Sequence, residues 1–356
     1  MRSVAGRGRC LCDILMGHTE MAVMNVREAI NQTLHEAMER DPSVILLGED
    51  VAGGAGTAGG QEAIGGIWGT STGLIGKFGP ERVIDTPISE SAIIGAAAGA
   101  ALAGMRPVAE LMFADFIGVC GDQLINQIAK FRYMFGGKAR CPVVVRLIYG
   151  AGMNSAAQHS QAFYNLLTAI PGLKVALPTT PADAKGLMNE ALTGDDPVMF
   201  FEHKALYGKK GEVPDGVHRV PFGHARMARE GGDVTIVALG RMVSFAEKTA
   251  DKLAEDGIGC DVIDPRTTSP LDEEVILDSV EQTGRLVVVD ESPPRCSVAT
   301  DITALVARKA FSSLDAPPEC VTAPHTPIPF APELERAYVP GPPAIEAAVR
   351  RTLDWG

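Results

Sequence analysis

The sequence DTPISESAIIGAAAGAALAGMRPVAELMFADF, residues 85 to 116, decides the fold class. A short apolar strand at 82–84 ends in its proline turn, Glu90 then stands just before a helix of small residues at 93–103, and a second apolar strand follows at 108–112. A strand, a helix and another strand in succession form the repeating unit of a parallel α/β sheet. Ligands of such sheets bind where strands lead into helices, so the segment also predicts the place of a site.

The same alternation extends in both directions. Asn25 is a candidate N-cap for an amphipathic helix over 26–40, and a buried parallel strand follows at 44–47. Further along we expect helices at 123–131, 243–256 and 299–311, and strands at 143–148, 173–176, 198–202, 234–239, 260–263 and 286–289. The pattern predicts an α/β protein made of two α/β/α domains.

Length and composition agree with two domains. The chain has 356 residues, of which 46% are hydrophobic, enough to bury two cores. Residues 208–230 are rich in glycine, proline and charge with little periodicity, which indicates a linker between a first domain at 24–207 and a smaller second domain at 231–356. Residues 1–23 are expected to be an N-terminal extension, either a dispensable tail or, as the alternative, an organellar presequence.

The charge and the cysteines exclude several classes of protein. The formal net charge of -12 disfavours binding to nucleic acid. The longest weakly polar run, 93–104, is too short to cross a membrane. The seven cysteines form no CxxC pair and no spacing typical of a zinc site or a disulfide scaffold, so a reducing cytoplasm fits best.

Two local patterns need interpretation before any family is considered. GAGTAG at 54–59 matches GxGxxG, but in dinucleotide-binding folds the glycines open directly into an apolar-faced helix, whereas 61–66 is polar and glycine-rich. We expect a mobile or ligand-lining loop there. Glu90, at a helix N-terminus, is either a capping charge or a ligand-binding group. Gly95 and Gly99 share one face of that helix and would let another helix or subunit approach closely.

Several separated motifs resemble one known family. The segment 85–116, FRYMFGGKA at 131–139, AAQHSQ at 156–161 and PGLKVALPTTPADAKGL at 171–187 resemble the β subunits of pyruvate, branched-chain 2-oxo acid and acetoin dehydrogenases. FEHKALY at 201–207, among others, is most similar to the acetoin branch. The resemblance runs from about residue 26 to the C-terminus. It implies a thiamine diphosphate-binding, pyrimidine-type domain followed by a transketolase C-terminal-like domain.

The resemblance also implies site residues. Glu90 matches the glutamate that hydrogen-bonds N1′ of the cofactor's aminopyrimidine, which favours the tautomer that removes the proton from the thiazolium C2. Phe116 matches the aromatic residue that packs on this ring, and Met112 lies on the same strand-to-loop segment. His159 matches the histidine that assists proton transfer and handover of the acyl unit to a lipoyl group. Without the resemblance to the family, Phe116 and Met112 would be interpreted as core side chains.

Further positions carry weaker expectations. His203 is expected to have a structural or substrate-shell role, and His325 to approach the site from the second domain. The carbonyls around Ala191 and Gly194 resemble a potassium-binding loop.

The second domain shows no catalytic constellation of its own. The resemblance implies subunit association and docking to the lipoyl acyltransferase core, for which Asp290, Glu291 and the C-terminal tail are candidates. Those carboxylates can equally form an ordinary solvated edge.

A missing motif implies a partner. The family binds the diphosphate through magnesium with a GDG motif followed by paired asparagines, and the sequence has neither. The resemblance therefore implies that magnesium is bound mainly by an α subunit. This subunit would complete a heterotetramer of two α and two β chains. The implied reaction is cleavage of acetoin, with transfer of the acetyl unit to lipoamide. The alternatives are the same chemistry on pyruvate or a branched 2-oxo acid, or a non-catalytic scaffold for the α subunit and the acyltransferase.

Overall fold

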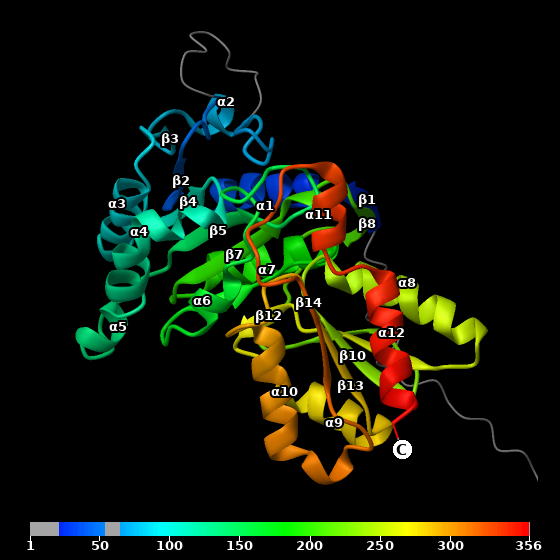
Figure 1. Cartoon of the computed structure of the whole chain (residues 1–356). Coiled ribbons are helices and arrows are strands. Elements are labelled where there is room, and N and C mark those ends of the chain that lie inside the picture. The colour runs from blue at the N-terminus through cyan, green and yellow to red at the C-terminus, as the bar shows by residue number, and fades with distance from the viewer. Residues whose placement is uncertain (1–20, 54–64, 356) are drawn as a thin grey trace, which may run out of the picture.

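The structure, a computed structural model, describes residues 21–53 and 65–355. These residues form two α/β units that lie against each other, the first coloured blue to green and the second mostly yellow to red in Figure 1. The predicted α/β fold is confirmed. The GAGTAG motif at 54–59 and most of the expected N-terminal extension lie outside the described residues.

The first unit is built on a seven-stranded sheet in the order β12-β6-β7-β5-β4-β2-β3. Its strands are β2 (Val44–Gly48), β3 (Val83–Asp85), β4 (Arg106–Leu111), β5 (Val144–Tyr149), β6 (Lys174–Ala176), β7 (Val198–His203) and β12 (Thr267–Ser269). Neighbouring strands are parallel except β12, which is antiparallel to β6. All residues of β2, β5 and β7 are buried, as expected for strands covered on both faces.

Helices cover both faces of this sheet. α1 (Val26–Arg40) and α7 (Pro181–Thr193) pack on one face, and α3 (Glu90–Leu102), α4 (Ile117–Asp122) and α6 (Tyr164–Thr168) pack on the other. The predicted N-cap at Asn25 is confirmed by a capping box with Glu28. The helix expected at 123–131 is divided into a π-helical turn and a short helix. The shorter elements are α2 (Leu74–Phe78), η2 (Ala114–Phe116), η3 (Gln123–Ile128), α5 (Phe131–Met134) and η4 (Lys204–Leu206).

The second unit is built on a five-stranded sheet in the order β14-β13-β10-β11-β9. Its strands are β9 (Arg226–Arg229), β10 (Val234–Ala238), β11 (Cys260–Asp264), β13 (Leu286–Asp290) and β14 (Glu319–Thr322). Its helices are α8 (Met242–Glu255), α9 (Glu273–Thr283), α10 (Val298–Lys309), η5 (Phe311–Ser313), α11 (Pro332–Tyr338) and α12 (Pro342–Leu353). Within the described ranges, no helix combines the length and the apolar character needed to cross a membrane.

The segment expected as a linker, 208–230, contains two strands. β8 (Lys210–Pro214) pairs antiparallel with β1 (Met21–Asn25), so residues 21–23 form a strand and not the end of a tail. β9 pairs antiparallel with β11 and so belongs to the second sheet. Most residues of β1 and β8 are exposed or half-buried, which explains why these segments lack a strong hydrophobic period.

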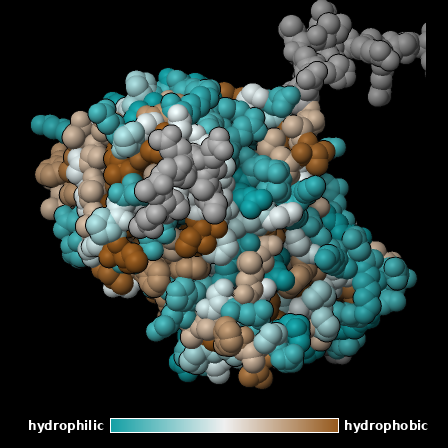
Figure 2. Space-filling view, turned by 90° about the horizontal axis from the view of Figure 1, so that it is seen from above, coloured by the Kyte–Doolittle hydropathy of each residue, from teal (hydrophilic) through white to brown (hydrophobic). Residues whose placement is uncertain are grey.

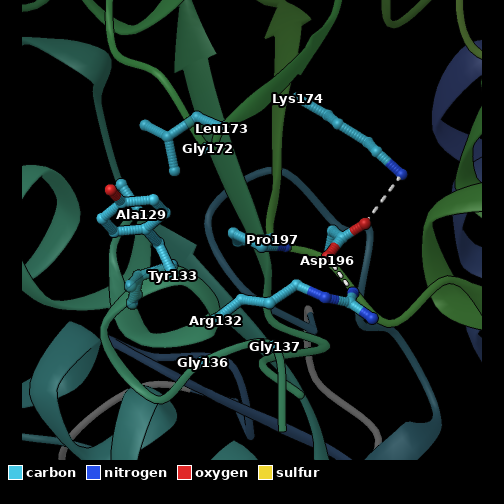
Figure 3. A pocket seen from close by; sticks show the side chains of 11 residues that line it. Ala129, Arg132, Tyr133, Gly136, Gly137, Gly172, Leu173, Lys174, Asp196 and Pro197 are labelled. Atoms are coloured by element: carbon cyan, nitrogen blue, oxygen red, sulfur yellow. Dashed lines mark hydrogen bonds and ion pairs between the residues drawn. The ribbon is translucent and has the colours of Figure 1, made fainter. Parts of the chain in front are cut away.

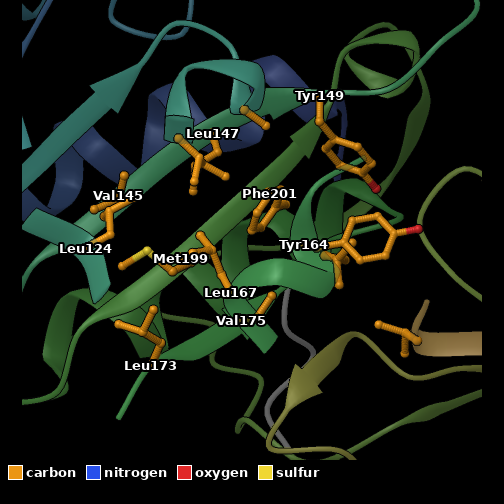
Figure 4. Close-up of a cluster of buried hydrophobic side chains, with 14 of the residues drawn as sticks. Leu124, Val145, Leu147, Tyr149, Tyr164, Leu167, Leu173, Val175, Met199 and Phe201 are labelled. Carbon is orange, nitrogen blue, oxygen red and sulfur yellow. The ribbon is translucent and has the colours of Figure 1, made fainter. Parts of the chain in front are cut away.

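One hydrophobic core joins the two units. Figure 4 shows its part around β5 and β7, where Leu147, Phe201 and Tyr164 lie together. The same cluster continues through Ile276 of α9 and Ile302 of α10 in the second unit. Since β12 also adds to the first sheet from the second half of the chain, the two units share both a core and a sheet.

Candidate active site

Parallel strands bring the candidate residues to one edge of the first sheet. Glu90 follows β3, Met112 and Phe116 follow β4, and His159 lies in the loop after β5. Lys204, which the sequence analysis did not single out, follows β7. These strands are neighbours in the order β7-β5-β4-β2-β3, so their carboxyl ends form one continuous edge. This is the edge at which parallel α/β sheets bind ligands.

Glu90 is the first residue of α3 and only 9% exposed. Within the described ranges its carboxylate makes no hydrogen bond or ion pair. Burial, and then the charges of Asp50 and Glu90, raise the pKa of Glu49, which follows β2. Burial, and then the charge of Glu90, raise the pKa of the Cys120 thiol in α4 to about 12. Glu90 therefore lies beside β2 and α4 with its oxygens free, an arrangement that favours a ligand.

Aromatic rings surround His159. The His159 ring meets Phe113 edge to face with centroids 4.6 Å apart, and it meets Phe116 in the same way at 5.6 Å. Phe113 and Phe116 are 6.0 Å apart, and Trp68 packs on Phe113 at 5.9 Å. Met112 precedes this cluster and is buried. Phe116 and His159 are thus in contact, and the structure adds Phe113, for which the sequence carried no expectation.

The loop that carries His159 is attached to the second unit. Glu335 of α11, which is buried, accepts hydrogen bonds from the backbone N–H groups of Gly152 at 2.8 Å and of Asn154 at 2.9 Å. Ala151 packs in a small apolar cluster with Tyr338. The ring nitrogens of His159 make no hydrogen bond within the described part of the chain, so the imidazole can exchange a proton with a ligand.

A buried ion cluster lies under this edge. Arg146 of β5 donates to both carboxylate oxygens of Glu202 at 2.6 and 2.7 Å, to Glu110 at 2.5 Å and to Thr70 at 2.9 Å. Tyr207 donates to Glu202 at 2.7 Å. Burial, and then the charge of Glu202, raise the pKa of Glu110, although Arg146 opposes the shift. The cluster fixes the ends of β4, β5 and β7 relative to each other.

The histidines and carboxylates of weaker expectation have other places. His203 is buried and its Nε2 lies 2.9 Å from Glu291, while its Nδ1 accepts from the N–H of Ala205, so the expected structural role fits its contacts. Asp290 is buried and accepts from Tyr164. The prediction that Asp290 and Glu291 offer a docking surface is therefore wrong, because both carboxylates bind side chains of the first unit.

The remaining expectations concern His325 and the potassium loop. His325 lies between Ala323 and Ile328, which pack with Ala151 of the loop that carries His159. His325 is exposed in the segment after β14. The carbonyl of Gly194, just after Ala191, accepts from the Arg106 guanidinium at 2.7 Å, and the carbonyl of Leu192 accepts from the same nitrogen at 3.2 Å. A guanidinium already supplies the positive charge between these carbonyls, so the group does not fit a potassium ion.

A large cleft lies at the opposite edge of the sheet. It has a volume of about 710 Å³ and is lined by residues such as Tyr133, Arg132 and Lys174. Figure 3 shows Lys174 and Arg132 both paired with Asp196 across it. Lys174 begins β6 and Pro197 precedes β7, so the cleft opens at the amino ends of these strands, away from the residues described above.

Comparisons with known proteins identify the family. Residues 22–210 match the model of the transketolase pyrimidine binding domain, and residues 223–345 match that of the transketolase C-terminal domain. The chain is 56% identical over 333 residues to the β subunit of acetoin:2,6-dichlorophenolindophenol oxidoreductase of Cupriavidus necator, covering 94% of this chain and 98% of that protein. The chain belongs to the family of acetoin and 2-oxo acid dehydrogenase β subunits.

Other members of the β-subunit family are similar over the same length. The subunit of the same name in Bacillus subtilis is 55% identical, covering 93% of this chain and 97% of that protein. The 2-oxoisovalerate dehydrogenase subunit beta of the same organism is 42% identical, covering 94% and 100%. A solved split-gene transketolase, described as an inactive β4 tetramer, matches with a TM-score of 0.74 at 24% identity over 93% of this chain and 99% of that chain, which supports the fold alone.

Proposed function

We propose that this chain is the β subunit of a thiamine diphosphate-dependent acetoin dehydrogenase that completes its active site with an α subunit. The observation that carries the proposal is Glu90, 9% exposed and with no partner for its carboxylate in the described ranges, on the sheet edge that also presents Phe116 and His159. The choice of acetoin is supported by identities of 56% and 55% to acetoin-oxidising relatives, against 42% to the 2-oxoisovalerate relative.

The residues of this chain fit one half of a cofactor site. Thiamine diphosphate, when bound, would supply the carbon nucleophile that attacks the ketone of the substrate. Glu90 would hydrogen-bond the aminopyrimidine at N1′, since its carboxyl group has no other partner in the described ranges. Phe116 and Met112 would form apolar walls for that ring. His159 would carry protons to and from the substrate and to the lipoyl group that receives the acetyl unit.

The other half of the site would come from a partner. Among the described residues, no group of histidine, cysteine or carboxylate side chains could hold a metal ion, so magnesium would be bound mainly by the α chain. The first unit exposes large apolar side chains, including Ile67, Ile88 and Val119, and Figure 2 shows apolar patches on it. A side-chain carbon added at Gly99 of α3 would meet no atom within 4 Å, so the helix surface is open at this point. We infer an assembly of two α and two β chains, with docking to a lipoyl acyltransferase.

The cysteines are consistent with a cytoplasmic enzyme. Those at positions 120, 141, 260, 296 and 320 are all free, and the first three are buried. Burial raises the pKa of the thiol of Cys141 to about 12 and of Cys260 to about 11, which keeps these thiols protonated and inert.

The test is reduction of 2,6-dichlorophenolindophenol by the chain co-purified with its α subunit, thiamine diphosphate and magnesium. Acetoin, pyruvate and 2-oxoisovalerate are compared as substrates. Activity confined to acetoin is expected. Preference for an oxo acid would keep the cofactor chemistry and overturn the substrate, and an intact assembly inactive on all three would favour the scaffold alternative.

A further inference from the structure

Lys204 is a buried lysine whose ammonium group lies against the His159 segment. It begins η4, directly after β7, and is 2% exposed. Its Nζ donates to the backbone carbonyl of His159 at 2.5 Å and to the hydroxyl of Ser160 at 3.1 Å. The same nitrogen lies 5.7 Å from the centre of the Phe113 ring, within the range of a cation–π contact. Lys204 thus touches the backbone of His159 and the ring on which its imidazole packs.

The two ends of the His159 loop are held by different units. Glu335 of α11 binds the backbone at Gly152 and Asn154, as described above. Between these anchors, Ala156 has a positive φ of 60°, a conformation that costs a non-glycine residue free energy and persists only where its surroundings impose it. Lys204 supplies the anchor nearest to the imidazole.

We propose that Lys204 is the positioning residue that holds the imidazole of His159 against Phe113 in its reactive orientation. The inference rests on the proposed function, in which His159 transfers protons. Lys204 acts through the backbone of His159 and the hydroxyl of Ser160, and no contact with substrate is required of it. A misplacement of a catalytic group by about 1 Å can lower a rate about 100-fold, so an anchor at this distance matters.

The charge of Lys204 titrates in an accessible range. Burial lowers the pKa of its ammonium group to about 8, although the carboxylates of Asp115, Glu335 and Glu291 oppose the shift. The contact of Lys204 with His159 is made by the backbone carbonyl of His159, which does not titrate. As the pH rises through about 8 the positive charge is lost, and the two charge-assisted hydrogen bonds become ordinary ones.

A matched control exists in the same chain. Lys209 is also partly buried, with a pKa lowered mainly by burial, and its Nζ also donates to a carbonyl, that of Thr179 at 3.2 Å, and to a serine hydroxyl, that of Ser244 at 2.9 Å. These partners belong to the contact between the two units and not to the His159 loop. Lys209→Met therefore removes the same chemistry without touching His159.

The experiment compares Lys204→Met, Lys204→Arg and Lys209→Met in the complex with the α subunit, by dye reduction with acetoin. Lys204→Met is expected to lower kcat about 10- to 100-fold with little change in KM, while Lys209→Met keeps kcat within about 2-fold. In a His159→Ala background, Lys204→Met should cause no further loss, because both changes remove the same function. A further loss of 10-fold in that background would overturn the proposal.

The pH profile gives a second readout that does not depend on Lys204→Met folding. For the wild-type complex kcat should fall above pH 8, and in Lys204→Arg this limb should move to higher pH, since a guanidinium stays charged. A limb that does not move in Lys204→Arg would overturn the role of Lys204. Absence of acetoin turnover by the wild-type complex would instead contradict the proposed function, so the two failures are distinguishable.

Discussion

Asp183 of α7 and Asp264 of β11, one from each unit, share the guanidinium of Arg226. Arg226 lies 3.8 Å from Asp183 and donates to Asp264 at 3.1 Å, and Arg266 lies 2.7 Å from the other oxygen of Asp183. Both carboxylates are 1% exposed. Buried charges of this kind are stable only when paired, so the two units are joined by an ion cluster that neither could form alone.

This cluster predicts a pH dependence of stability. Burial, and then the charge of Asp183, raise the pKa of Asp264 from 3.8 to about 6. The folded state therefore holds a proton between about pH 4 and 6 that the unfolded state releases, and stability falls as the pH rises through this window. Asp264→Asn lacks the titrating group. Urea titrations at pH 4 to 7 give the free energy of unfolding of both proteins. Relative to Asp264→Asn, the wild type should become less stable as the pH rises from about 4 to about 6. A constant difference would contradict this.

Glu90→Gln tests the central carboxyl group. It should lower acetoin-dependent dye reduction by about 100-fold or more while leaving assembly with the α subunit unchanged, because an amide cannot exchange the proton. Glu274→Gln is the matched control, since Glu274 also lies in the first turn of a helix, α9, but is exposed in the second unit. Equal losses of activity in both variants would mean that Glu90 acts only as a capping charge at the N-terminus of its helix.

Arg146→Met should destabilise the chain by about 3 to 5 kcal/mol, because it leaves Glu110 and Glu202 buried without their counter-ion. Arg132→Met is the control, since its ion pair with Asp196 is open to solvent and should contribute little to stability. Unfolding midpoints in urea give both values. A loss below 1 kcal/mol for Arg146→Met would show that the cluster contributes little to stability.

Glu335→Gln should reduce activity through the loop of His159. An amide side chain offers one acceptor oxygen where the carboxylate offers two, so one of the N–H groups of Gly152 and Asn154 loses its partner. We expect kcat with acetoin to fall several-fold. Glu333→Gln is the control, since Glu333 lies on the same helix but is exposed, and it should have no effect. If Glu335→Gln kept full kcat, the second unit would have no role in positioning the His159 loop.

Much of the fold could be predicted because its signals are local. The capping box at Asn25 and the apolar runs of β2, β5 and β7 are written in consecutive residues. β12 could not be predicted, because three residues that pair with a strand about 90 positions earlier carry no period of their own. The strands within 208–230 were missed for the same reason.

The candidate site likewise contains residues that could be predicted from the sequence and residues that could not. Glu90, Phe116 and His159 belong to motifs that resemble the family. Lys204 was not predicted, because within FEHKALY the functional expectation concerned the neighbouring His203. Its signal, a lysine between a buried strand and an apolar turn, becomes informative only once the loop after β5 is folded beside it. Asp290 and Glu291 were misread because a pair of acidic residues after a strand is more often solvated than buried.

The pairing of β12 with β6 limits how the enzyme can open. A rigid rotation of one unit away from the other would have to break backbone hydrogen bonds between Thr267–Ser269 and the first sheet, as well as the shared apolar core. In the proposed enzyme, acetoin and a lipoyl arm would therefore enter through movement of short loops, or according to how the α subunit covers the sheet edge. In such a complex the α subunit and the short loops would control access to the site, while the two units of this chain would keep their positions relative to each other.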